Sequence, residues 1–213
     1  MSIIYGVAPS PFVRKVMLAH AFKNVPYEFK TAFPGSDDAE FRAASPLGKV
    51  PGYKTDSGAT FPDSSVIIAY LERTAPEVKL YPVNADDFGF ALWLEEYADT
   101  KMTEATTALY YQRVIGPKFF SHITDEERVT EVIESLIPPV LDYVESLLNT
   151  EQWLIADTFS VADISVGVNL MNLLHADYEI DAVKWPKISA YNSRFLGLEL
   201  VKAQIEVENQ VLN

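Results

Sequence analysis

The spacing of hydrophobic residues changes near Pro82, so the chain has two parts with different patterns. In the first part, short apolar stretches alternate with segments of helical period. The expected strands are residues 2–5, 27–30, 52–55 and 60–61, and the expected helices are residues 11–22, 37–44 and 63–73. Asp56-Ser57-Gly58 is a hairpin signal between the last two strands. The predicted order is β-α-β-α-β-β-α, in which a helix joins two parallel strands and a hairpin follows.

After Pro82 the strand signals disappear and the apolar residues keep a helical period. The expected helices are residues 86–115, ended by Gly116-Pro117; 125–148, interrupted or kinked at Pro138-Pro139; 161–174, almost wholly apolar and therefore central; 186–195; and 198–211. The prediction is an α/β domain at residues 1–80, a linker at residues 81–84 and an all-α domain at residues 85–213.

The composition excludes several kinds of chemistry. The chain has 213 residues, is 48% hydrophobic and contains no cysteine, so it has no disulfide, no protein thiolate and no cysteine-ligated metal. Its histidines, His20, His122 and His175, are far apart, and we predict no metal site. There is neither a secretory signal nor a run of about 20 apolar residues, so we expect a cytoplasmic protein without membrane contact.

The net charge of −13 disfavours binding to nucleic acid. The acidity is unevenly distributed. Residues 1–80 carry nine basic and eight acidic side chains, a net +1, whereas residues 81–213 carry eight and 22, a net −14. An anionic small molecule is therefore compatible with the first part of the chain.

Three short segments could carry chemistry. Ser10-Pro11 opens a helix, whose free amides and partial positive charge favour an anion, although a plain helix cap is the commoner role of such a serine. In Lys49-Val50-Pro51 the proline, cis or trans, leaves the backbone of Val50 available to a ligand, although the segment taken alone is an ordinary proline turn. Asp63-Ser64 offers a carboxylate and a hydroxyl at another helix start, which could hold an α-amino acid terminus or simply cap the helix.

In this order and on this topology, the three segments resemble those of the cytosolic glutathione transferase family, in its serine-type, plant-like and bacterial members. The resemblance covers essentially the whole chain and implies a thioredoxin-like N-terminal domain, an all-α C-terminal domain and a homodimer. It implies Ser10 as the catalytic residue, and glutathione as co-substrate bound by Lys49, Val50, Pro51, Asp63 and Ser64. Residues 159–164 resemble the family's structural capping motif, with Ser160 and Asp163 as its polar members.

The implied activity is conjugation of the glutathione thiolate to a small hydrophobic electrophile, as in detoxification, with the thiolate stabilised by Ser10. Peroxide reduction and isomerisation stay open, whereas disulfide chemistry is disfavoured because the chain lacks cysteine. Tyr5 is the alternative hydroxyl. The alternative function is a non-catalytic glutathione-binding, ligand-binding or protein-interaction module of the same fold.

The expected electrophile pocket lies between the domains, and its candidate residues are mostly aromatic. They are Pro9, Phe12, Phe33, Tyr110, Tyr111, Arg113 and Phe119. Arg14 and Lys15 are interpreted as solvated surface charges, with steering of the anionic tripeptide as the alternative. Two residues depart from the family pattern: Pro62, which could shift Asp63 and weaken glutathione binding, and Ala156, which stands where a glycine commonly precedes the turn at Asp157.

Overall fold

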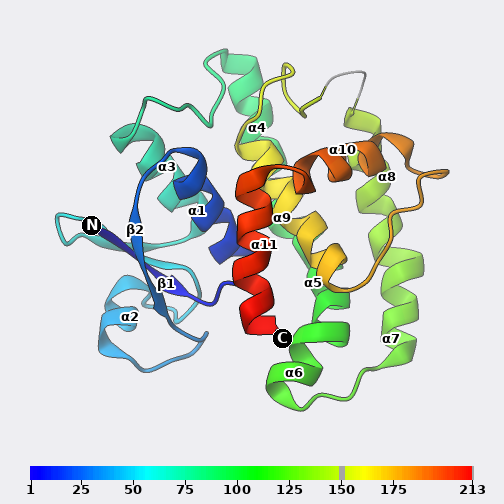
Figure 1. Ribbon diagram of the computed structural model, residues 1–213, viewed down its shortest axis with the longest axis horizontal. Helices are drawn as coiled ribbons and strands as arrows, with labels where there is room; N and C mark the ends of the chain where they lie inside the picture. The colour runs from blue at the N-terminus through cyan, green and yellow to red at the C-terminus, as the bar shows by residue number, and fades with distance from the viewer. Residues whose placement is uncertain (149–151, 213) are drawn as a thin grey trace. The chain divides into compact units, whose positions relative to one another are not determined.

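The computed structural model describes residues 1–148 and 152–212 (Figure 1). Backbone proximity groups the chain into two compact units. The first unit comprises Met1–Leu80 together with Leu200–Val211, and the second comprises Tyr81–Glu199. Most of the last helix, α11 (Glu199–Leu212), therefore packs with the first unit, although it is distant from that unit in sequence. The predicted domain limits stay a prediction.

The first unit contains a four-stranded mixed sheet in the order β2-β1-β3-β4. The strands are β1 (Ser2–Gly6), β2 (Tyr27–Thr31), β3 (Gly52–Lys54) and β4 (Thr60–Pro62). The helices that follow the strands are α1 (Pro11–Phe22), α2 (Ala39–Ala44) and α3 (Ser64–Thr74). β1 pairs parallel with β2 and antiparallel with β3, which confirms the predicted thioredoxin-like order.

The two faces of β1 meet different helices, because successive residues of a strand point to opposite sides. A Cβ atom added to Gly6 would lie 2.5 Å from Cγ2 of Val13, so this end of β1 approaches α1 too closely for any side chain. Tyr5 points to the other face, where it packs with Phe41 and Ala44 of α2. The two candidates for the catalytic hydroxyl, Tyr5 on β1 and Ser10 before α1, therefore have different surroundings.

The second unit is helical. Its helices are α4 (Ala85–Tyr97), α5 (Thr103–Tyr110), α6 (Gly116–Phe120), α7 (Glu126–Glu131), α8 (Ile137–Leu147), α9 (Val161–His175) and α10 (Pro186–Leu196). Three π-helical turns, Ala98–Met102, Tyr111–Ile115 and Val132–Leu136, join successive helices without a loop. α9 is the central helix, as predicted, since its residues from Val161 to Leu173 are all buried.

The predicted end of the first long helix at Gly116-Pro117 is wrong. The helical path continues through α6 and ends at Phe120, where Ser121 takes a left-handed φ of 52°. Pro117 lies in the first turn of α6, directly after a π-helical turn whose last bond runs from the Gly116 amide to the Tyr111 carbonyl. Pro138 is likewise in the first turn of α8, so the predicted interruption at Pro138-Pro139 falls at a junction between a π turn and an α-helix.

The predicted capping motif of α9 is confirmed as a reciprocal capping box. The Ser160 hydroxyl accepts from the Ala162 amide at 3.3 Å, and the Asp163 carboxylate accepts from the Ser160 amide at 2.9 Å. The other carboxylate oxygen accepts from the Leu154 amide and from the Tyr191 hydroxyl, both at 3.1 Å. One buried carboxylate thus joins the start of α9 to the preceding loop and to α10.

Ala156 and Asp157 form a tight turn between the bridged residues Ile155 and Thr158, with φ of 46° and 52°. A left-handed backbone is strained for alanine and unstrained for glycine, so a glycine at position 156 would form this turn without strain. Ala156→Gly is expected to raise the free energy of unfolding by about 0.5–1 kcal/mol, the relieved strain exceeding the added entropy of the unfolded chain. Urea denaturation measures this.

The matched control is Ala190→Gly, an exposed position within α10. There glycine is expected to lower the free energy of unfolding by about 1 kcal/mol. Equal losses in both variants would contradict the strain at Ala156.

Candidate active site

Ser10 stands at the start of α1 without capping it. β1 ends at Gly6, the Ser10 amide donates to the Val7 carbonyl at 3.0 Å, and Pro11 opens the helix. Ser10 occupies the N-cap position, yet its side chain makes no capping hydrogen bond. Its half-buried hydroxyl has no hydrogen-bond partner among the described residues, and the first amides of α1 have no intrahelical acceptor. Donors for an anion therefore gather at this helix start.

Tyr5 is less suited to binding an anion. Its hydroxyl donates to the Glu40 carboxylate at 3.4 Å, and the same carboxylate oxygen accepts from Lys30 at 2.7 Å. Burial, and then the negative charge of Glu40, raise the pKa of the Tyr5 hydroxyl. A thiolate beside Tyr5 would have to displace a carboxylate and approach its charge. These surroundings favour Ser10 over Tyr5, and the choice between them stays a prediction.

The Val50-Pro51 peptide bond is cis. The amide and carbonyl of Val50 have no hydrogen-bond partner among the described residues, so both remain available to the backbone of a ligand. The Lys49 side chain is exposed, while its carbonyl accepts from the Ser45 hydroxyl at 2.6 Å. The segment is thus held by its neighbours while Val50 keeps its backbone groups unpaired.

Asp63 is the N-cap of α3 and has a strained backbone. One oxygen of its carboxylate accepts from the amides of Ser65 at 3.0 Å and Val66 at 3.1 Å. Its φ of 82° and ψ of 128° are unusual for a residue other than glycine and cost about 1–3 kcal/mol, a strain that collects at functional sites. Ser64 is the first residue of α3 and is buried. Pro62 ends β4 immediately before this turn.

The register of the sheet brings these segments to one end of it. Gly52 of β3 pairs with Tyr5 of β1 on one side and with Pro62 of β4 on the other. The segment before β3, which contains Val50, therefore lies at the same sheet end as the exit of β1 toward Ser10 and the exit of β4 toward Asp63. Three segments that are far apart in sequence converge in the first unit.

The interpretation of Arg14 and Lys15 as solvated charges is wrong, because neither side chain is exposed. Lys15 donates to the Ser65 hydroxyl in the first turn of α3 at 3.0 Å, and Arg14 pairs with the carboxylate of Glu208 in α11. Neither Ser65 nor Glu208 lies in a sequence motif that predicts these contacts. Charge normally predicts exposure, and only contacts between distant parts of the chain reverse that rule here.

The seven candidate electrophile residues divide between the units. In the first unit Pro9 is buried, Phe12 is half-buried and Phe33 is exposed. In the second unit Tyr110 is buried beside His175, Tyr111 and Phe119 are exposed, and Arg113 donates to the Ala176 carbonyl at 2.8 Å, at the end of α9. Their role as a pocket stays a prediction.

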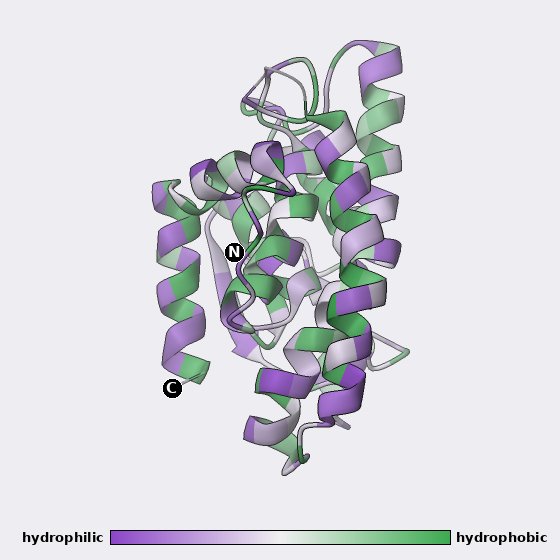
Figure 2. Ribbon diagram, turned by 90° about the vertical axis from the view of Figure 1, so that its right-hand side faces the viewer, coloured by the Kyte–Doolittle hydropathy of each residue, from purple (hydrophilic) through white to green (hydrophobic). Residues whose placement is uncertain are grey.

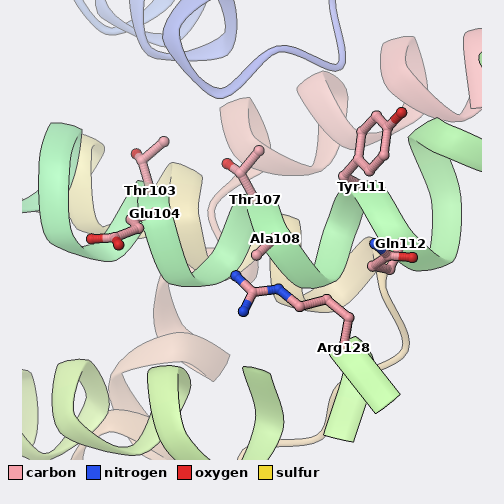
Figure 3. A pocket seen from close by; sticks show the side chains of 7 residues that line it. All are labelled: Thr103, Glu104, Thr107, Ala108, Tyr111, Gln112 and Arg128. Carbon is pink, nitrogen blue, oxygen red and sulfur yellow. The ribbon is translucent and has the colours of Figure 1, made fainter. Parts of the chain in front are cut away.

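An open pocket of about 400 Å³ lies within the second unit, between the helical path through α5 and the start of α7 (Figure 3). Its lining residues are Thr103, Glu104, Thr107, Ala108, Tyr111, Gln112 and Arg128. Figure 3 shows Thr103, Thr107 and Tyr111 along one side of the helical path, and Arg128 reaching across from α7 on another. Of the candidate electrophile residues, Tyr111 lines this pocket.

No group of three or more His, Asp or Glu side chains within residues 1–148 and 152–212 is arranged to hold a metal ion. In the same ranges no helix has both the length and the apolar character needed to cross a membrane.

A thioredoxin-like unit with three polar segments at one end of its sheet, followed by a helical unit, defines the class of fold. Residues 4–79 match the sequence model of the glutathione S-transferase N-terminal domain, and residues 112–207 match that of the C-terminal domain. Together these matches span more than half of the chain. The chain therefore belongs to the glutathione S-transferase family.

Known proteins resemble this chain over most of its length. Glutathione S-transferase 4 of Zea mays is 28% identical over 195 residues, which are 88% of this chain and 84% of that protein. Maleylacetoacetate isomerase of Mus musculus is 24% identical over 205 residues, or 93% and 89% of the two chains. The crystal structure of a glutathione S-transferase from Methylobacillus flagellatus, with glutathione bound, has a TM-score of 0.78 and 22% identity, covering 96% of this chain and 98% of that one.

Proposed function

We propose that this protein is a glutathione transferase that conjugates the glutathione thiolate to a small hydrophobic electrophile, with Ser10 stabilising the thiolate. The observation that carries the proposal is the Ser10 hydroxyl, which stands at the start of α1 without capping it. Family membership supports the general activity. The role of Ser10 in stabilising the thiolate and the class of electrophile go beyond what family membership supports.

The γ-glutamyl and cysteinyl parts of the tripeptide each have a suitable segment at this end of the sheet. The start of α3, with Asp63 and Ser64, would hold the γ-glutamyl group through its carboxylate, hydroxyl and helix-start amides. The unpaired backbone groups of Val50 would pair with the cysteinyl residue, as an added strand pairs with a sheet edge. Lys49, exposed beside them, supplies a positive charge near the anionic tripeptide.

The chemistry required of Ser10 is modest. A free thiol has a pKa near 8.5, and lowering it by about two units needs about 2.7 kcal/mol of preferential thiolate stabilisation. A charge-assisted hydrogen bond contributes about 1.5–3 kcal/mol, and the start of α1 adds a favourable potential. The thiol proton leaves to solvent, the sulfur bonds to the electrophilic carbon, and the leaving group departs with its electron pair.

Other reactions of the same thiolate remain within the proposal. The likeness to mouse maleylacetoacetate isomerase supports a test of glutathione-dependent isomerisation, in which sulfur adds to a double bond and later leaves. Peroxide reduction likewise needs no sulfur from the protein. A purely binding role is the alternative, and it predicts glutathione retention without turnover.

The experiment is retention on glutathione resin combined with turnover of 1-chloro-2,4-dinitrobenzene. We expect elution by free glutathione and conjugation at pH 6.5. Retention without turnover of this substrate, a peroxide or an isomerisation substrate would favour the binding module. Failure of retention would contradict the proposed glutathione site itself.

We also propose a homodimer. α4 presents large apolar side chains to solvent, with Trp93 51% exposed and Phe88 41% exposed, as expected of a surface that another chain covers. The expected mass in equilibrium sedimentation is twice the 23.8 kDa of one chain. A mass of 23.8 kDa at micromolar concentration would contradict the dimer.

A further inference from the structure

α11 is joined to the start of α1 by a fully buried ion pair. Arg14 donates from Nε to Oε1 of Glu208 at 2.7 Å and from Nη2 to Oε2 at 2.6 Å, a two-bond arrangement between residues 194 positions apart. Both side chains are 0% exposed. α1 and the paired part of α11 belong to the same compact unit, and Figure 2 shows hydrophilic and hydrophobic residues alternating along α11, the helix that ends at C.

The ion pair lies one helical turn from Ser10. The Arg14 amide donates to the Ser10 carbonyl at 2.8 Å, and Arg14 Nη2 also reaches the Pro9 carbonyl at 3.4 Å. The guanidinium thus contacts the peptide immediately before Ser10 and the carboxylate of Glu208 together. Any movement of Arg14 changes the support of the backbone that carries the Ser10 hydroxyl.

Gln204 completes the connection one turn earlier in α11. Its amide nitrogen donates to Oε1 of Glu208 at 2.8 Å and lies 3.8 Å from the sulfur of Met17 in α1. The Glu208 carboxylate is therefore oriented within its own helix as well as by Arg14. A buried carboxylate that is hydrogen-bonded from two sides is held in one orientation.

Stability alone does not require such a pair. Buried ion pairs contribute little net stability compared with apolar residues of similar volume, because both charges must be desolvated. A two-bond pair has a strict geometry, however, and can fix the relative position of the groups that it joins.

We propose that Glu208, through its ion pair with Arg14, is a positioning residue that holds the Ser10 hydroxyl in place for the glutathione sulfur. The inference rests on the proposed function of Ser10 and extends it to α11. Neither Arg14 nor Glu208 is assigned a contact with the reacting atoms. Their effect is carried by the Pro9–Ser10 backbone.

Glu208→Gln tests this, because it keeps the side-chain size and removes the charge and the two-bond geometry. In the pH profile of conjugation, the apparent pKa of the glutathione thiol is expected to rise by about one unit, and kcat/KM at pH 6.5 to fall about tenfold. The KM for glutathione should stay within about twofold. A direct field effect has the opposite sign, since an uncompensated Arg14 cation would lower the pKa of the thiol.

A double variant separates positioning from stability. Arg14→Met combined with Glu208→Leu removes both charges and fills the space with apolar atoms, so its Tm is expected near that of the wild type. The raised pKa of the thiol should persist, because the contact to the Pro9 carbonyl is lost. Recovery of both Tm and the wild-type pH profile would overturn the proposal. This variant decides the matter if Glu208→Gln fails to fold.

The matched control lies at the other end of α1. Lys23 pairs with Glu72 of α3 at 2.7 Å, and the Lys23 side chain is 0% exposed. Glu72→Gln is expected to lower Tm without changing the pH profile. If Glu208→Gln behaves as this control does, the positioning role is wrong. If Ser10→Ala also leaves conjugation intact, the proposed function fails as well, so the two failures are distinguishable.

Discussion

Replacing Ser10 with alanine is expected to lower kcat/KM for conjugation at pH 6.5 by about 10- to 100-fold, the equivalent of one charge-assisted hydrogen bond to the thiolate. The apparent pKa of the bound thiol should rise by one to two units, measured by the ultraviolet absorbance of the thiolate. Glutathione affinity should change little, since its contacts are assigned to Val50, Asp63 and Ser64.

The same substitution should leave the fold intact. Loss of a serine N-cap usually costs about 1 kcal/mol, but Ser10 makes no capping hydrogen bond to lose. Unchanged thermal unfolding with slower conjugation would therefore assign the loss to chemistry. Unchanged activity would contradict the catalytic role of Ser10.

Tyr5→Phe is the matched control. It removes one hydroxyl from the same end of the sheet, together with the contact to Glu40. Activity is expected to stay within about twofold, because the hydroxyl of Tyr5 is engaged with a carboxylate and makes a poor thiolate donor. A collapse of activity in this variant alone would transfer the role to Tyr5.

The largest effect on stability is expected at Asp163. Asp163→Ala removes a buried acceptor and leaves the amides of Leu154 and Ser160 and the hydroxyl of Tyr191 without it. Each buried donor left unsatisfied costs about 1–3 kcal/mol, so we expect a loss of about 3–5 kcal/mol. For a chain of this size, each kcal/mol lowers Tm by about 2–4 °C, which calorimetry can follow.

The control for Asp163 is Asp125→Ala. Asp125 also accepts from a helix-start amide, that of Arg128 at 3.0 Å, but at an exposed position. Its loss is expected to cost about 1 kcal/mol. Equal losses at the two positions would contradict the importance of burial.

The pH dependence of Asp163 has a defined sign. Burial raises the pKa of its carboxyl to about 6, against an ordinary value near 3.8. Between these values the folded chain keeps a proton that the unfolded chain releases, so this group lowers the free energy of unfolding as pH rises from about 4 to 6. Asp163→Asn, which cannot ionise, is expected to lack this decline. A parallel decline in both proteins would contradict it.

The order of elements was predictable because alternating and helical periods are local properties of the chain. The capping box of α9 was also visible, since Ser160 and Asp163 lie three residues apart before an apolar segment. The helical path through Gly116-Pro117 was not, because it depends on a π-helical turn directly before α6, which has no local sequence signal.

The sequence predicted the three segments of the candidate site, but it did not predict that they lie close together. Only strand pairing shows that Gly52 lies between Tyr5 and Pro62, and therefore that Val50, Ser10 and Asp63 belong to one end of the sheet. Burial of Arg14 and Lys15 escaped prediction because their partners, Glu208 and Ser65, lie far along the chain. From the local sequence alone, a charged side chain is predicted to be exposed. A partner far along the chain can bury it.

The most direct test of the central claim is a crystal structure with glutathione bound. We predict the sulfur about 3.0–3.5 Å from the Ser10 hydroxyl oxygen, within hydrogen-bonding distance, and farther from the Tyr5 hydroxyl. A sulfur bonded to Tyr5, or held away from both hydroxyls, would contradict the assignment of the thiolate to Ser10.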